Sequence, residues 1–115
     1  MGVSTNFLVV WGRKIPWHQQ LVDLYEEHYD DKQAPWVLVD GMSGEYVVMG
    51  VKLWDSGDAR WGFEDMDPAR VIDLAILPAW EKAYKEHFEK YYPTLSHLMY
   101  PDFQMHVFAH FSRNS

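Results

Sequence analysis

The amino-acid sequence predicts an α+β fold in which a four-stranded antiparallel sheet carries two helices on one face. Apolar and polar residues alternate in several short stretches, a pattern typical of strands. Two further stretches repeat apolar residues at the spacing of an amphipathic helix. These stretches follow one another in the order strand, helix, strand, strand, helix, strand. Two amphipathic helices need one apolar sheet face, and alternating strands offer one.

The first strand is predicted over residues 6–15 and the first helix over residues 16–29. The strand is apolar on both sides, because Phe7 and Val9 alternate with Leu8. This pattern favours a central strand that is covered, at least in part, on both faces. The helix that follows has its apolar residues at helical spacing, and a polar stretch ending in proline predicts a loop after it.

Residues 36–40 and 45–54 are predicted to pair as a hairpin. Gly41 and Gly44 lie in the connection, where glycine tolerates the backbone angles of a tight turn. The return strand has Val47, Met49, Val51 and Leu53 on one face, and Tyr46, Val48, Gly50, Lys52 and Trp54 on the other.

The longest predicted element is a helix over residues 67–92. Asp67 is expected to cap it and Pro68 suits the first helical position, whereas Pro78 predicts a kink or a break because it lacks a backbone N–H. The stripe expected to pack on the sheet consists of Trp80, Ala83, Tyr84, His87, Phe88 and Tyr91.

The last strand is predicted over residues 102–112, after one further helical turn near residues 94–99. One face of this strand has Phe103, Met105, Val107, Ala109 and Phe111, and the other has Gln104, His106, Phe108 and His110.

The order of the elements is that of the ferredoxin-like "split βαβ" fold, although a variant with another strand order fits the same pattern. A chain of 115 residues is expected to form one domain over residues 1–115. The second sheet face carries Phe108 and either Val48 or Val47. Because this apolar face would need a cover, a homodimer formed through it is one expectation.

The composition excludes several classes of function. A formal charge of −7 argues against direct binding to nucleic acid or to an anionic membrane. The absence of cysteine excludes disulfides, thiol catalysis and cysteine-based zinc sites. No signal peptide and no apolar run of about 20 residues is visible, so the expected protein is soluble and cytoplasmic.

No metal or cofactor is predicted. His106 and His110 lie four residues apart on a strand, which separates them by about 13 Å, too far to share one ion. The loop that begins at Asp55 and Asp58 is rich in carboxylates but does not match the EF-hand pattern. A turn that leads into a helix cap accounts for it more simply.

His110-Phe111-Ser112 has the H-x-S/T form that 2H phosphoesterases use in pairs. Because the chain holds a single such motif, we take the match as accidental.

The aromatic content points to a binding surface. Six tryptophans are too many to be fully buried in a small domain, so some are expected to line an interface or a pocket beside carboxylates. An equal alternative is that they simply enlarge the core. The partner- or ligand-binding candidates are Trp54, Asp55, Asp58, Trp61, His106, Phe108 and His110. No catalytic residue is assigned.

The stretch STNFLVVWG at residues 4–12, followed by Lys14, resembles the opening of small uncharacterised accessory proteins of tailed bacteriophages. The resemblance implies a counter-defence or host-takeover role in the host cytoplasm, exerted by binding a host protein.

Three functions therefore remain open. The first is a non-enzymatic acidic protein that blocks or recruits a host protein through exposed tryptophans on a flat patch. The second is a binder of a small molecule or nucleotide, with aromatic residues stacking on the ligand in a tryptophan-lined cleft between the sheet and the loop at residues 55–67. The third is a minor hydrolase that uses His110 or the aspartates, which requires a histidine and a carboxylate within hydrogen-bond reach.

Overall fold

The computed structural model describes residues 2–27, 36–59, 62 and 65–114. Its four-stranded antiparallel sheet with packed helices confirms the α+β class. The strands are β1 (Gly2–Pro16), β2 (Val37–Val39), β3 (Tyr46–Asp58) and β4 (Gln104–Asn114). The helices are α1 (Gln19–Glu27), α2 (Leu77–Tyr91) and the 3-10 helices η1 (Leu74–Ile76) and η2 (Pro93–Met99).

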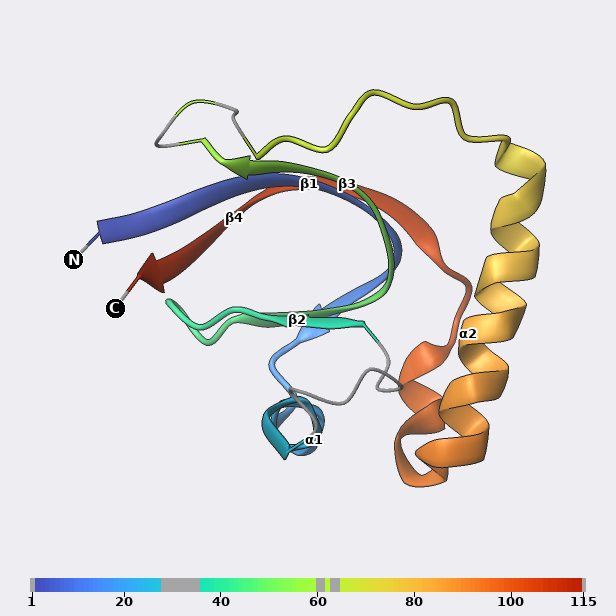
Figure 1. Ribbon diagram of the computed structural model, residues 1–115. Coiled ribbons are helices and arrows are strands. Elements are labelled where there is room, and N and C mark those ends of the chain that lie inside the picture. The colour runs from blue at the N-terminus through green and yellow to red at the C-terminus, as the bar shows by residue number, and fades with distance from the viewer. Residues whose placement is uncertain (1, 28–35, 60–61, 63–64, 115) are drawn as a thin grey trace.

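The strands lie in the order β2-β3-β1-β4, and each neighbouring pair is antiparallel. Figure 1 shows that the sheet bends sharply and folds over on itself, with both chain termini at the open end. We call the part formed by β4 and residues 2–11 and 51–58 the terminal arm. The hairpin arm consists of β2 with residues 13–16 and 46–49. The inner face lies between the two arms, and the outer face is the opposite one.

A pair of glycines lies where the two arms meet. Gly12 pairs directly with Gly50 across β1 and β3. A Cβ atom on Gly12 would lie 2.0 Å from the carbonyl oxygen of Met49, and Gly50 has a φ of +142°. Only glycine allows the two backbones to approach so closely and to take these angles, so this pair permits the bend.

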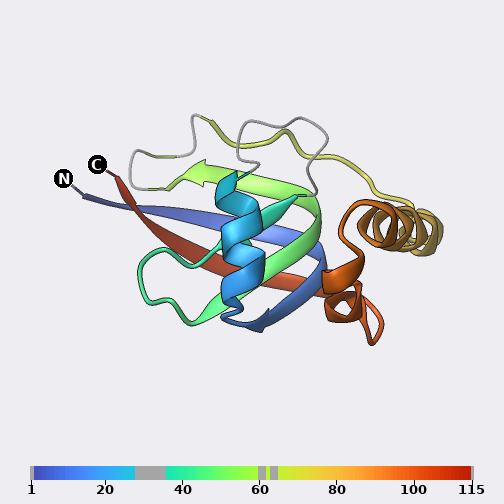
Figure 2. The ribbon, with the colours of Figure 1, turned by 90° about the horizontal axis from the view of Figure 1, so that it is seen from below.

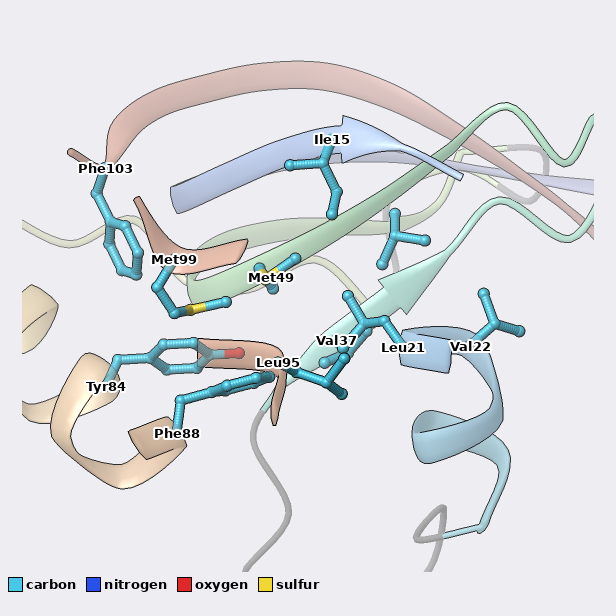
Figure 3. Close-up of a cluster of buried hydrophobic side chains, with 11 residues drawn as sticks. Ile15, Leu21, Val22, Val37, Met49, Tyr84, Phe88, Leu95, Met99 and Phe103 are labelled. Atoms are coloured by element: carbon cyan, nitrogen blue, oxygen red, sulfur yellow. The ribbon is translucent and has the colours of Figure 1, made fainter. Parts of the chain in front are cut away.

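The main core lies between the helices and the outer face of the hairpin arm (Figure 3). Tyr84 and Phe88 of α2 point towards Met49 of β3, and Leu21 of α1 lies near Val37 of β2. Figure 2 shows α1 across the sheet, and α2 with η2 beyond the bend, at the end opposite the termini. The helices therefore cover the hairpin arm and the bend.

A second, smaller core fills the inner face. Leu8, Val10 and Val48 are buried there, and Val10 has no exposed surface. Four partly buried side chains pack against them, namely Trp36, Leu38, Tyr46 and Phe108. Because Ile15 of β1 is buried in the main core, β1 has buried side chains on both faces, as its apolar pattern predicted.

The prediction of one long helix over residues 67–92 is wrong in its first half. The α-helix begins at Leu77, and Val71, in the first half of the predicted helix, is 99% exposed. Pro78 therefore lies in the first turn of α2, where its missing N–H costs nothing, and not in the middle of a helix. Asp73, not Asp67, provides a helix cap, and it caps η1.

Asp67 has a different role from the predicted one. Its carboxylate accepts a hydrogen bond from the backbone N–H of Asp55 at 2.9 Å. Its backbone carbonyl accepts a bond from the indole N–H of Trp54 at 3.1 Å. These contacts tie the segment that follows β3 to the sheet.

The predicted stripe of α2 is also rotated. The buried positions are Leu77, Tyr84 and Phe88, whereas Trp80 is half-buried and Tyr91 is exposed. Trp11 of β1 explains the rotation, because its indole N–H donates to the carbonyl of Leu77 at 2.9 Å and fixes the start of the helix.

The outer face of the terminal arm is apolar and uncovered. Val107 is 77% exposed, although the sequence placed it on the same apolar face as Phe103, which is buried. The exposed apolar side chains on this face, which we call the outer apolar patch, are Val3, Phe7, Met105, Val107 and Phe111. The bend keeps the helices away from this part of the sheet.

Neither α-helix in the described part of the chain has the length and apolar character needed to cross a membrane.

Candidate functional site

The strongest candidate site is a pocket of about 480 Å³ between the two arms of the sheet. Residues from both arms and from α1 line it. They are Asn6, Leu8, Tyr25, Trp36, Leu38, Val39, Lys52, Asp55, His110 and Ser112. The polar members come from the terminal arm, and the aromatic and aliphatic members come mostly from the hairpin arm and α1, so the pocket has one polar wall and one apolar wall.

Asp55 anchors the polar wall. Its Oδ1 accepts hydrogen bonds from the side-chain amide of Asn6 and from the backbone N–H of Gly57, both at 2.8 Å. Its Oδ2 accepts from the ammonium group of Lys52 at 3.3 Å. Partial burial disfavours the charged form, but these hydrogen bonds and the charge of Lys52 outweigh it and lower the pKa of Asp55. Asp55 is therefore ionised at neutral pH and paired with Lys52.

His110 lies across β1 from this pair and is only 5% exposed. Burial is the main cause that lowers its pKa, and the negative charges of Asp40 and Asp55 oppose this effect without reversing it. The imidazole is therefore neutral at pH 7. Its Nδ1 lies 2.8 Å from the hydroxyl of Tyr46, whose pKa is raised by burial and by the charges of Asp40 and Glu45.

The tautomer of His110 follows from this contact. The phenol of Tyr46 keeps its proton, and an imidazole nitrogen is a better acceptor than a phenol oxygen. The Tyr46 hydroxyl therefore donates to Nδ1, which places the ring proton of His110 on Nε2. Among the described residues, Nε2 has no hydrogen-bond partner, so it can offer an N–H donor to a ligand.

Trp36 supplies the apolar wall with a flat, half-buried ring. Its backbone carbonyl accepts a hydrogen bond from the Tyr84 hydroxyl at 2.8 Å. Burial raises the pKa of Tyr84 far above its ordinary value, so this hydroxyl remains a donor. Because Tyr84 belongs to the main core, the core of the protein positions the pocket's tryptophan.

The inner face continues beyond the pocket as an aromatic cluster. Phe108 packs edge-on against Tyr46, with ring centroids 6.2 Å apart. The Lys14 ammonium group lies 4.3 Å from the centroid of the Tyr46 ring. This cluster supports the Tyr46–His110 pair from the side away from the pocket.

The structure brings several of the predicted site residues onto one face. Asp55 and His110 line the pocket, and Phe108 lies beside it. Asp58 lies on the same arm, where it accepts bonds from the Ser4 hydroxyl and the Thr5 backbone N–H at 3.2 and 3.3 Å.

Three other predicted residues lie elsewhere. His106 shares the strand face of His110 but does not line the pocket, and burial lowers its pKa. Trp54 of β3 donates its indole N–H to the backbone carbonyl of Asp67, which lies in the segment after β3. Trp54 does not line the pocket. Trp61 lies outside the described residues.

Sequence reasoning missed most of the pocket. Asn6 and Lys52 are polar positions on otherwise apolar strands, and this alternation is the signal that could have identified them. His110 and Ser112 of the H-x-S stretch both line the pocket, since alternate residues of a strand share a face. Tyr25 and Trp36 come from segments whose approach depends on the bend, and no local pattern predicts that approach.

The other pockets in the described surface are weaker candidates for a ligand site. One of about 390 Å³ runs along the charged side of α2, where Lys85 pairs with Glu81 at 2.7 Å. These side chains already neutralise one another on an open helix face. Within the described residues, no group of three or more histidine, aspartate or glutamate side chains is placed to hold a metal ion.

No family model, curated protein or solved structure matches the chain.

Proposed function

We propose that this protein is a non-enzymatic binder of a small molecule, which it holds between the two arms of its folded sheet. The observation that carries the proposal is the 480 Å³ pocket, which combines an aromatic wall with a few converging polar groups. Ligand sites in proteins have this size and composition. The second hypothesis of the sequence analysis was also a ligand pocket, but it was expected between the sheet and the loop at residues 55–67, whereas the one tryptophan among the described lining residues here is Trp36.

A binding role is favoured over a hydrolytic one by the contacts of His110. General acid–base catalysis requires a histidine oriented towards a carboxylate or a nucleophile. Within the described residues, His110 bonds to the hydroxyl of Tyr46, and no hydrogen bond joins it to a carboxylate or to Ser112. The pocket thus contains a hydrogen-bond donor but no assembled catalytic pair.

Blocking the pocket provides the test. Ser112→Trp should fill it with an indole ring, whereas Ser43→Trp places the same ring on the exposed hairpin loop. A small-molecule library is screened by thermal shift and by ¹H–¹⁵N NMR. A ligand at about 100 times its Kd should stabilise the wild type and Ser43→Trp by about 2.7 kcal/mol, but not Ser112→Trp. Compounds that stabilise all three proteins equally, or no stabilising compound at all, would contradict the proposal.

The outer apolar patch supports a second candidate function, namely protein binding. The first hypothesis of the sequence analysis expected exposed tryptophans on a flat patch. None of the described tryptophans is strongly exposed, so tryptophans do not support the protein-binding function. Instead, the patch joins Val107 and Phe111 of β4 to Phe7 of β1. If the phage resemblance holds, the partner is a host protein in the host cytoplasm.

A homodimer is the alternative occupant of this surface. The sequence suggested a dimer through the face that carries Phe108, but the exposed large apolar side chains of the described sheet lie on the opposite face. β4 is also an edge strand, and residues 104–112 contain no Asp, Glu, Lys or Arg to discourage pairing with a second copy.

We also propose that the fold is a variant of the ferredoxin-like arrangement. The position of β3 between β1 and β2, and of β1 between β3 and β4, supports it, since each pair joined by a helix is split by another strand. The sharp bend at Gly12 and Gly50 and the 3-10 helices are what make it a variant.

A further inference from the structure

Among the described residues that line the pocket, no Lys or Arg lacks a carboxylate partner. Lys52 is the one Lys or Arg among the described lining residues, and its ammonium group is paired with the Asp55 carboxylate at 3.3 Å. A phosphate group here would meet the Asp55 carboxylate and would find no unpaired Lys or Arg among the described lining residues.

The uncharged polar groups of the pocket can both donate and accept hydrogen bonds. His110 Nε2–H is a donor, and the hydroxyl of Ser112 can serve in either role. The amide of Asn6 uses one hydrogen to reach Asp55, which holds its plane in place and leaves its second N–H and its carbonyl to face a ligand. These three groups lie on neighbouring strands, because Asn6 pairs with His110 and Ser112 follows on β4.

The opposite wall offers aromatic rings to a flat ligand. Trp36 and Tyr25 line the pocket, and the hydrogen bond from Tyr84 holds the backbone of Trp36 in place. Aromatic side chains bind planar heterocycles by stacking, and this contact requires no charge.

We infer that the ligand is an uncharged, planar heterocycle with hydrogen-bond donors and acceptors, of the nucleobase or nucleoside class, and that the pocket excludes nucleoside phosphates. This inference rests on the proposed small-molecule function. The sequence suggested a nucleotide as one candidate ligand. The inference restricts that ligand to a base or nucleoside, because the pocket recognises a base but not a phosphate group.

The test compares matched ligands on the full-length protein by calorimetry and ¹H–¹⁵N NMR at neutral pH. The probes are adenosine, guanosine, cytidine and uridine, their 5′-monophosphates, inorganic phosphate, and indole as an aromatic ring without an acceptor. At least one nucleoside should shift the resonances of pocket residues. Its monophosphate should bind at least about tenfold more weakly, because the phosphate meets the Asp55 carboxylate. Inorganic phosphate should not compete.

Two variants, each with a matched control, test which residues cause the stacking and the preference for nucleoside over monophosphate. Trp36→Leu should weaken nucleoside binding about tenfold through lost stacking. Trp17→Leu, which removes a half-buried tryptophan outside the pocket, should leave the affinity unchanged. Asp55→Asn removes the carboxylate and releases Lys52, so it should reduce the preference for nucleoside over monophosphate. Asp23→Asn, on the exposed side of α1, should not change that preference.

Failure of the inference and failure of the proposed function have different signatures. Equal or tighter binding of the monophosphate, or indole binding as tightly as the best nucleoside, overturns the inference while leaving the pocket as a ligand site. If library compounds bind but none of the nucleosides does, the inference is likewise overturned while the pocket remains a ligand site. If neither the nucleosides nor the library shift any pocket resonance, both proposals are overturned.

Discussion

At the scale of single residues, the contact between Tyr46 and His110 determines the chemistry of the pocket. Tyr46 comes from the start of the hairpin's return strand and His110 from the last strand, 64 positions later. Burial keeps both groups uncharged at neutral pH, so their hydrogen bond leaves Nε2 as the N–H donor of His110, a residue that lines the pocket. Asp40, which accepts three backbone hydrogen bonds in the hairpin loop, places a fixed negative charge nearby.

The burial of His110 predicts a dependence of stability on pH. Its pKa is lowered in the folded protein from an ordinary value of 6.5, so the unfolded chain binds the proton more readily. The free energy of unfolding is therefore highest above pH 6.5 and falls as the pH drops below that value, until the folded-state pKa is passed. His106 contributes in the same direction.

This dependence is measured as the urea midpoint between neutral pH and about pH 5, a range in which the carboxylates remain ionised. His110→Gln should flatten the profile, with a smaller effect for His106→Gln. Gln104→Ala, at an exposed position of β4 that does not titrate, is the control and should leave the slope unchanged. If the urea midpoint depends on pH in the same way in His110→Gln as in the wild type, His110 is not the cause of this dependence.

At the scale of elements, the paired glycines of β1 and β3 matter more than any single apolar residue. A strand can continue straight through most residues, but Gly12 and Gly50 allow two neighbouring strands to bend at the same point. The bend separates the arms, and the separation creates both the pocket and the uncovered outer apolar patch.

Gly12→Ala tests this role. The new Cβ would lie 2.0 Å from the Met49 carbonyl oxygen, which belongs to the backbone and cannot move aside without a shift of β3. We expect a loss of about 3 kcal/mol or more in the free energy of unfolding, measured by urea denaturation. Gly41→Ala meets no atom within 4 Å and should change stability by no more than about 0.5 kcal/mol. Near-equal stabilities of the two variants would show that the bend does not depend on Gly12.

At the scale of the whole molecule, the outer apolar patch and the open edge of β4 predict self-association. Two copies could pair β4 strands across a two-fold axis and bring their apolar patches together, because residues 104–112 contain no Asp, Glu, Lys or Arg. The expected assembly is a dimer, measured by sedimentation velocity over a range of concentrations.

Val107→Glu should shift the dimer to monomer without a large loss of stability, since Val107 is 77% exposed. Val71→Glu, at another exposed valine away from the sheet, should leave the assembly unchanged. A wild-type protein that stays monomeric at high concentration would rule out the dimer and leave a foreign partner as the occupant of the patch.

The sequence by itself determined the local features of this protein. Alternation in the hairpin region and in the last strand predicted β3 and β4, and helical spacing predicted α1 and the second half of the long helix. These predictions succeeded because period and turn chemistry are properties of neighbouring residues. Asp55, Phe108 and His110 were named as candidates from their residue types and their positions along the chain.

Only the tertiary structure decided which of these residues meet. The start of α2 at Leu77 depends on contacts with Trp11 that come from the other end of the chain, so the pattern after Asp67 gave the wrong helix boundary. The pocket exists because two glycines, 38 positions apart in sequence (50 minus 12), pair and bend the sheet, which brings Trp36 opposite His110. The alternation of residues along a strand specifies the sheet face on which each side chain lies. The curvature that brings the two arms of the sheet to face each other arises only when strands pair.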